Sequence, residues 1–229
     1  MADDLSGTVI DIPGFGLQYF AIPKVACSSV MAAMADLLDI EFPDQEWKPE
    51  LFQTHKWDGL YDRSKVVLTK RQAFGVKQKR VRFALVRNPW DRLVSCYSEK
   101  IREDGDPENF ADGVSRVLLP YGIFRKNMDF ADFVEAVVSI PEFKSEPHWR
   151  SQFTFLIDDF GRMRMDFLGR FENVRDLEVF LCSCTAREVK LPHLLASSRT
   201  HYRDYYTPRL RNLVAERYAR DIRSFKYAY

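Results

Sequence analysis

The chain has 229 residues, of which 46% are hydrophobic and 14% aromatic, so it can bury one sizeable α/β core and is expected to form a single domain over residues 1–229. Its formal net charge of +1 excludes the strongly basic balance typical of nucleic-acid-binding proteins, so any anionic ligand must be bound by local groups. No apolar stretch approaches the roughly 20 residues that span a bilayer, and the N-terminus lacks the segments of a signal peptide, so we expect a soluble, cytoplasmic protein.

The first predicted elements are a strand and a helix joined by a short loop. Residues 16–22 form an apolar run that predicts the strand, and residues 28–38 predict the helix, which Ser28 or Ser29 can cap. The stretch 41–78 is polar and irregular, with a weak helical pattern around residues 55–61 and a short apolar run at 66–68, and its pattern does not assign regular elements.

A second strand and helix follow with clearer signals. Residues 81–86 are apolar apart from Arg82 and predict a buried strand. Asn88 is expected to cap the next helix with Pro89 at its first position, because proline fixes φ and has no N–H to satisfy. This helix is expected to end near Arg102.

The rest of the chain predicts mostly helices. It contains, in order, an exposed loop at 103–113, a helix at 130–138, a hairpin or two short strands within 153–171, a helix at 173–182 and a long helix from Thr207 to Ser224. The long helix begins with a cap followed by proline, and its apolar residues have helical spacing, so it is expected to bury one face.

The cysteines and histidines give no sign of a metal site. The four cysteines include no CxxC pair, and the four histidines show no HExxH or similar spacing. We therefore expect reduced thiols and no bound metal ion.

The loop at residues 23–29, called the Lys24 loop below, has the features of an anion-binding site. Lys24 directly follows the first strand, and Ser28 and Ser29 lie at the start of the helix. One ammonium, two hydroxyls and the unpaired N–H groups of a helix start suit the oxygens of a phosphate or sulfate. The phosphate-binding spacing GxxxxGK[ST] is absent from the chain, and an ordinary turn with serine caps is the alternative interpretation.

Residues 87–95, called the Arg87 segment, have similar features. Arg87 follows the strand at 81–86, at the end where ligands gather in open parallel sheets, and Ser95 lies two turns into the next helix. A guanidinium and a hydroxyl near a helix terminus suit a dianionic phosphate, with each charged hydrogen bond worth about 1.5–3 kcal/mol. Alternatively, Arg87 pairs with Asp91 or stabilises a loop. Together the two segments imply a ligand with two anionic ends.

Four segments in the same order resemble motifs of the sulfotransferases of the carbohydrate type that use 3′-phosphoadenosine 5′-phosphosulfate (PAPS), the group containing heparan sulfate 2-O- and chondroitin 4-O-sulfotransferases and many bacterial relatives. The segments are Ile22–Ser29, Phe83–Ser95, the sequence HWRSQ at His148–Gln152, and Tyr205–Pro208 with the helix that follows as far as Tyr227. The resemblance covers nearly the whole chain. It implies an α/β fold, a P-loop-NTPase-like three-layer sandwich with a mostly parallel central sheet flanked by helices.

The resemblance also implies which residues bind the donor. In such enzymes the first motif holds the 5′-phosphosulfate and the second holds the 3′-phosphate. The first role falls here on Lys24, Val25, Ala26, Cys27, Ser28 and Ser29, and the second on Arg87 and Ser95. Backbone contact is the simplest role for Cys27. Arg199 and Tyr202 lie in a segment that resembles the loop closing over the nucleotide, so they are further candidates for donor contact, with a solvated linker as the alternative.

The implied reaction is an in-line displacement, in which an acceptor oxygen attacks sulfur while the bridging oxygen leaves with growing negative charge. Lys24 and the helix-start N–H groups are expected to neutralise that charge without a metal ion. A base must take the acceptor proton, and histidine suits this role at neutral pH. His55 is the first candidate, because similar enzymes place a histidine base before the Arg-Asn-Pro segment. His148 is its rival, with a packing role as the alternative.

The acceptor is expected to be a carbohydrate, a glycolipid or a related small hydroxylated molecule, and nucleic acid is not expected as a partner. Vertebrate relatives carry a membrane anchor and a stem, whereas this chain begins close to its first motif. The resemblance therefore implies a bacterial-type enzyme that does not span a membrane, peripheral to one if the acceptor is a lipid. The alternatives are a P-loop-type kinase and a non-catalytic anion- or nucleotide-binding protein on the same fold.

Overall fold

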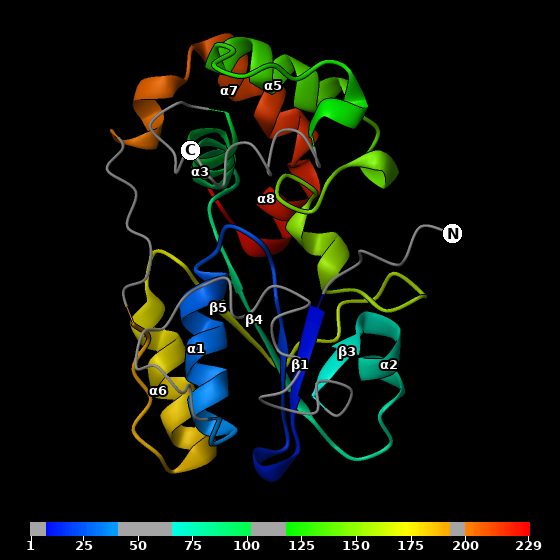
Figure 1. Cartoon of the computed structure of the whole chain (residues 1–229), viewed down its shortest axis with the longest axis vertical. Helices are drawn as coiled ribbons and strands as arrows, with labels where there is room; N and C mark the ends of the chain where they lie inside the picture. The colour runs from blue at the N-terminus through cyan, green and yellow to red at the C-terminus, as the bar shows by residue number, and fades with distance from the viewer. Residues whose placement is uncertain (1–7, 41–65, 102–117, 193–199) are drawn as a thin grey trace. The chain divides into compact units, whose positions relative to one another are not determined.

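The computed structural model describes residues 8–40, 66–101, 118–192 and 200–229. The chain divides into two compact units (Figure 1). The first comprises Met1–Val86 and Thr154–Leu195, and the second comprises Arg87–Phe153 and Ala196–Tyr229. The chain passes from the first unit to the second between Val86 and Arg87, the point at which the predicted strand gives way to the Arg87 segment.

A five-stranded sheet forms the centre of the first unit. Its strands are β1 (Thr8–Ile12), β2 (Leu17–Phe20), β3 (Val67–Thr69), β4 (Val81–Val86) and β5 (Phe167–Arg170). They lie in the order β3-β1-β2-β4-β5. β4 pairs in parallel with β2 and β5, whereas β1 pairs antiparallel with β2 and β3. The predicted α/β fold is confirmed, but the sheet is mixed and not mostly parallel as expected.

The antiparallel pairs arise from β1, a strand that the sequence pattern did not reveal. Only a 3-10 turn, Pro13–Phe15, and Gly16 separate β1 from β2. Such a short connection permits antiparallel neighbours alone, since a parallel crossover needs a dozen or more residues. Gly16 ends the turn at a left-handed φ of 65°, which glycine adopts without strain.

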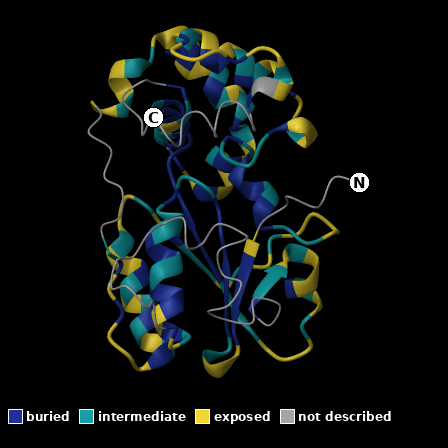
Figure 2. Cartoon of the chain, in the orientation of Figure 1, coloured by how far each residue is buried: buried dark blue, intermediate teal, exposed yellow. Residues whose placement is uncertain are grey.

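Among the residues of this unit that the structure describes, the helices beside the sheet are α1 (Cys27–Leu37), α2 (Lys70–Gly75) and α6 (Val174–Thr185). In Figure 1, α1 and α6 lie to the left of the strands and α2 lies to the right. Aromatic rings pack between α6 and the sheet. Phe180 of α6 stacks on Phe167 of β5 with 4.1 Å between ring centroids, and it lies 5.7 Å from Phe83 of β4. In Figure 2 the dark colour of β1, β2 and β4 shows that most of their residues are buried, whereas β3 is half-buried or exposed.

Of the hairpin or two short strands expected within 153–171, the structure contains one strand and one isolated bridge. The segment begins within a 3-10 helix, Gln152–Phe155, and contains a single antiparallel bridge between Ile157 and Met163. Its last part forms β5, which pairs with β4 and not with the strand that would precede it in a hairpin.

The described part of the second unit is helical. It contains α3 (Pro89–Lys100), α5 (Phe130–Ser139), α7 (Pro208–Arg217) and α8 (Ala219–Phe225), with short 3-10 helices at Leu119–Tyr121, Glu142–Lys144 and Tyr202–Tyr205. Their apolar faces share one core, in which Phe133, Trp149 and Val214 are almost fully buried. Within the described ranges, no helix is both long and apolar enough to cross a membrane.

The long final helix of the sequence analysis is in fact two helices, α7 and α8. Thr207 caps α7 as expected, because its hydroxyl accepts from the N–H of Leu210 at 3.3 Å. Tyr218 interrupts the run with φ −106° and ψ 24°. Its buried hydroxyl donates to the carbonyl of Trp149 at 2.5 Å. The residue between α7 and α8 is therefore hydrogen-bonded to the HWRSQ sequence.

Candidate functional site

The Lys24 loop connects β2 to α1 through an unusual backbone. Lys24 and Ala26 have left-handed φ values of 70° and 61°, which residues other than glycine rarely adopt. They alternate with Val25 and Cys27, whose φ values are not positive. Alternating backbone of this kind can turn successive N–H groups into one concavity, and such a nest binds anions. Strain of this type is retained where the surrounding structure enforces it, which is common at functional sites.

The start of α1 has no side-chain cap. The N-cap is Ala26, so the predicted capping by Ser28 or Ser29 is wrong, and both serines lie inside the first turn. The N–H groups of Cys27, Ser28 and Ser29 have no acceptor within the helix. Neither serine hydroxyl bonds to another residue in the described part of the chain. This helix start therefore offers several donors for an anionic ligand.

Cys27 is unsuited to act as a nucleophile. Burial raises the pKa of its thiol to about 11, although a contact with the Tyr19 side chain lowers it slightly. Burial also raises the pKa of Tyr19 well above its usual value, so both groups stay neutral at physiological pH. Because the thiol is neutral, it does not reduce the positive potential that Lys24 and the backbone N–H groups of the loop produce.

The Arg87 segment begins in the second unit with the predicted cap. The side chain of Asn88 accepts from the N–H of Trp90 at 3.0 Å, and Pro89 occupies the first helical position. Arg87 is almost buried, with 8% of its side chain exposed, and its Nε donates to Asp91 Oδ2 at 2.8 Å. The pairing of Arg87 with Asp91, which the sequence offered as the alternative to phosphate binding, is thus present. Ser95 is half-buried in α3.

The HWRSQ sequence contains the residue that fixes the backbone of Arg87. The Gln152 side chain accepts from the N–H of Arg87 through Oε1 at 2.9 Å, and its Nε2 donates to the carbonyl of Arg87 at 2.8 Å. Gln152 is completely buried. Because the two residues lie 65 positions apart, no local signal in the sequence could have predicted this pairing.

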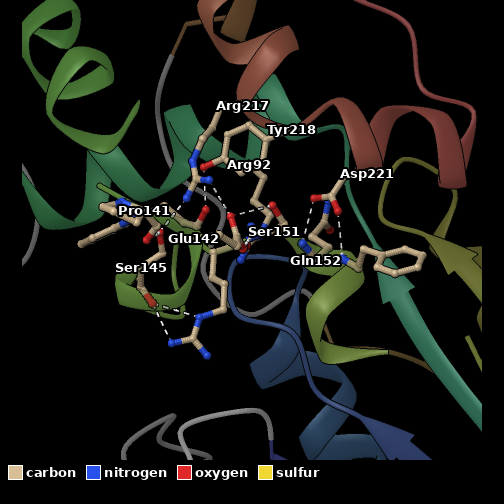
Figure 3. A network of polar contacts seen from close by, with 12 residues as sticks. Arg92, Pro141, Glu142, Ser145, Ser151, Gln152, Arg217, Tyr218 and Asp221 are labelled. Carbon is tan, nitrogen blue, oxygen red and sulfur yellow. Dashed lines mark hydrogen bonds and ion pairs between the residues drawn. The ribbon is translucent and has the colours of Figure 1, made fainter. Parts of the chain in front are cut away.

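Asp221 of α8 fixes the backbone of Gln152 in turn (Figure 3). Its carboxylate accepts from the N–H groups of Gln152 and Phe153, each at 2.8 Å. Burial raises the pKa of Asp221 to about 6, while the two backbone N–H groups and Arg92 work in the opposite direction.

Two arginines hold the stretch that leads to Gln152. Arg92 of α3 donates to the carbonyls of Arg150 at 2.7 Å and Pro147 at 2.9 Å. Burial lowers the pKa of Arg92. Arg217 of α7 pairs with Glu142 at 2.6 Å, and Glu142 accepts from both the N–H and the hydroxyl of Ser151 (Figure 3). The HWRSQ sequence is therefore anchored by three helices of its unit, namely α3, α7 and α8.

His148 lies in a polar setting and not in the core. Its Nδ1 is 2.6 Å from Glu146 Oε1, its N–H donates to Oε2 of the same carboxylate at 2.7 Å, and 29% of its side chain is exposed. Burial disfavours the ionised form of Glu146, but the charge and hydrogen bonds of His148, with help from Lys100, lower the pKa of Glu146 below its usual value. A carboxylate on Nδ1 fixes the tautomer, so proton exchange would take place at Nε2.

The other predicted site residues are placed as follows. His55 and Arg199 lie outside the described residues. Tyr202 is half-buried. Its ring centroid lies 5.8 Å from that of Tyr229, in an edge-to-face arrangement, and 5.8 Å from the guanidinium carbon of Arg203. The Lys24 loop belongs to the first unit, whereas Arg87, Ser95, His148 and Tyr202 belong to the second. In the parts of the chain that the structure describes, no three His, Cys, Asp or Glu side chains are arranged to hold a metal ion.

Comparison with models of known protein families gives a match over nearly the whole chain. A model described as sulfotransferase family matches residues 9–228, which include both the Lys24 loop and the Arg87 segment. The searches of curated proteins and of solved structures found no match.

Proposed function

The chain belongs to the sulfotransferase family, and from this we propose that it transfers a sulfuryl group from PAPS to a hydroxyl of a carbohydrate, a glycolipid or a related small molecule. The observation that supports the proposal most is the backbone of the Lys24 loop. Two non-glycine residues there adopt left-handed φ next to a helix start without a side-chain cap. That combination suits a group with several anionic oxygens, such as a phosphosulfate.

The 5′ end of the donor is assigned to the Lys24 loop, residues Lys24, Val25, Ala26, Cys27, Ser28 and Ser29. During transfer the acceptor oxygen forms a bond to sulfur, the bond from sulfur to the bridging oxygen breaks, and 3′-phosphoadenosine 5′-phosphate (PAP) leaves with the electron pair. Lys24 and the first-turn N–H groups would stabilise the charge on that oxygen. This role requires only fixed positive groups, and a metal ion is not part of the proposal.

The 3′ end of the donor is assigned to Arg87 and Ser95. The pairing of Arg87 with Asp91 orients the guanidinium through Nε and does not exclude a phosphate, because a guanidinium carries five N–H donors. An arginine that is already oriented loses less entropy on binding than a flexible one. The 3′-phosphate distinguishes PAPS from ordinary adenine nucleotides, so these residues would set donor specificity. Arg199 and Tyr202 remain candidates for contact with the rest of the nucleotide.

The base is assigned to His55, with His148 as the rival. The assignment of His55 rests on the family, since this residue lies outside the described ranges. The support for His148 is its carboxylate partner, because a histidine with Glu146 on Nδ1 can accept a proton at Nε2. The family match disfavours a P-loop-type kinase, and no observation favours a non-catalytic role.

Ligand-linked stabilisation tests the proposed donor. The melting temperature is measured with PAP, ADP and ATP, each with and without magnesium. We expect PAP to stabilise the protein most, and independently of magnesium. Equal stabilisation by ADP, or a requirement for magnesium, would contradict the proposal. PAPS consumption over a panel of sugars and glycolipids then identifies the acceptor.

A further inference from the structure

Gln152 makes an unusual pair of contacts with the residue assigned to the 3′-phosphate. Its amide bonds to both the N–H and the carbonyl of Arg87, at 2.9 and 2.8 Å. We propose that Gln152 is a positioning residue that sets donor specificity, by fixing the peptide groups on both sides of Arg87. The inference rests on the proposed function and goes beyond it, because the resemblance to sulfotransferases assigned no role to Gln152.

The position of Arg87 in the chain explains why it needs such a partner. β4 ends at Val86 and α3 begins at Pro89, so the backbone of Arg87 belongs to neither element. Buried N–H and carbonyl groups outside strands and helices must still find partners. The Gln152 amide supplies one acceptor and one donor, and it thereby satisfies both backbone groups of Arg87 at once.

Burial makes the conformation of Arg87 costly to change. Gln152 is fully buried and Arg87 is 6% exposed. If the peptide groups of Arg87 rotated, the amide of Gln152 and the backbone of Arg87 would both lose their partners away from water. The guanidinium is then restrained from two sides, by its own backbone and by Asp91 on Nε.

Gln152 is itself fixed by residues distant in sequence. Asp221 accepts the N–H groups of Gln152 and Phe153, and Arg92 holds the carbonyls of Pro147 and Arg150 just before it (Figure 3). The side chain that meets Arg87 thus extends from an anchored segment. Restraint of this kind is what a site needs in order to hold a ligand group in one geometry.

The test compares nucleotides with and without the 3′-phosphate. The dissociation constants of PAP and of adenosine 5′-monophosphate (AMP) are measured for the unmodified protein, Gln152→Leu and Gln152→Glu. The leucine removes both hydrogen bonds. The glutamate keeps an acceptor for the N–H of Arg87 but places an oxygen against its carbonyl. Gln72→Leu is the matched control, since exposed Gln72 also accepts a hydrogen bond from a backbone N–H, in the capping box of α2.

We expect Gln152→Leu to weaken PAP binding by about 10- to 100-fold, while AMP binding changes by less than about threefold. Gln152→Glu should give a smaller loss in the same direction, and Gln72→Leu should leave the ratio of the two constants unchanged. In turnover, KM for PAPS should rise with kcat nearly constant, because contacts to the 3′-phosphate are made equally in the ground and transition states.

Two results would overturn the proposal. One is a folded Gln152 variant in which the ratio of the dissociation constants of PAP and AMP is that of the unmodified protein. Whether the two affinities are unchanged or fall by the same factor, this outcome indicates a purely structural role. The other is rapid hydrogen exchange at the amide of Arg87 in the unmodified protein, which is measurable even if both variants fail to fold. Failure of the proposed function is distinguishable, because the unmodified protein would then not prefer PAP over AMP.

Discussion

Asp221 and Gln152, 69 positions apart in the chain, are joined by a hydrogen bond of 2.8 Å from the Gln152 N–H to a buried carboxylate. This contact links α8, near the end of the chain, to the segment that holds Arg87. The carboxylate is almost fully buried, which disfavours its ionised form, and the N–H groups of Gln152 and Phe153 offset only part of that cost. The stability of the protein should therefore depend on the protonation of Asp221.

The first prediction concerns the pH dependence of unfolding. The pKa of Asp221 is raised from 3.8 to about 6 in the folded protein, chiefly by burial. Between these values the folded state binds more protons than the unfolded chain, so this residue makes the free energy of unfolding fall as the pH rises from about 4 to 6. Glu146 acts in the opposite direction because its pKa is lowered in the folded protein.

Comparison with Asp221→Asn isolates the contribution of this residue. Urea unfolding is measured for both proteins at pH 4.5 and at pH 7. The substitution should be more destabilising at pH 4.5 than at pH 7, by about 2 kcal/mol, since the unmodified protein carries the cost of the buried charge only at the higher pH. An equal effect at both pH values would mean that Asp221 does not titrate in this window.

The sequence predicted the parts of the fold whose signals are local. β4, the cap at Asn88 and Pro89 at the start of α3 were all found, because an apolar run, a capping side chain and a proline each act on their immediate neighbours. β1 was missed, since a five-residue strand has little periodicity and its role depends on pairing with β2 and β3.

The site was predictable in its residue types but not in its geometry. The positions of Lys24 and Arg87 after strands indicated anion binding. The left-handed φ of Lys24 could not be predicted, because glycine is the residue that signals such a backbone in a sequence. The role of Gln152 was hidden because its partner lies 65 positions away. Within HWRSQ the sequence indicated a role for His148 alone, whereas the last residue of the motif, Gln152, holds the backbone of Arg87.

The second prediction separates the two ends of the donor. Arg87→Ala should weaken PAP binding by at least tenfold but change binding of adenosine 5′-phosphosulfate little, because only PAP carries the 3′-phosphate. Lys24→Ala should mainly lower kcat, since its charge is needed most when the leaving oxygen becomes anionic. Calorimetry and initial rates measure these effects. Equal losses for both nucleotides in Arg87→Ala would refute the assignment of the 3′ end.

The third prediction decides between the two histidines. His55→Ala should reduce kcat by about 100-fold or more and leave PAP affinity nearly unchanged, because a general base acts on the acceptor and not on the product nucleotide. His148→Ala should have the smaller effect on kcat. Should His55→Ala instead turn over normally, the base would be sought at His148, and Glu146→Gln should then lower kcat as well.

The fourth prediction concerns the thiol in the Lys24 loop. Since burial raises the pKa of Cys27 to about 11, its thiolate fraction at pH 7.5 should be about a hundredfold below that of an ordinary cysteine, and alkylation should be correspondingly slow. Mass spectrometry after iodoacetamide treatment measures the rate at this site. Cys27→Ala should retain sulfotransfer within a few-fold. Rapid alkylation at neutral pH, or loss of turnover in Cys27→Ala, would instead indicate an activated thiol.

The fifth prediction tests the packing of side chains over β5. A Cβ atom added at Gly169 of β5 would lie 2.9 Å from Leu85 Cδ1 and 3.2 Å from Phe167 Cε1, so the side chain of Leu85, which is fully buried, would have to shift to make room for it. Gly169→Ala should therefore lower the free energy of unfolding by about 1–3 kcal/mol. Gly75→Ala is the matched control, because a Cβ at Gly75 meets nothing within 4 Å. Since Leu85 is followed after one residue by Arg87, the strain from Gly169→Ala should also weaken PAP binding more than Gly75→Ala does. A neutral Gly169→Ala would show that the side chains of Leu85 and Phe167 can make room at little cost.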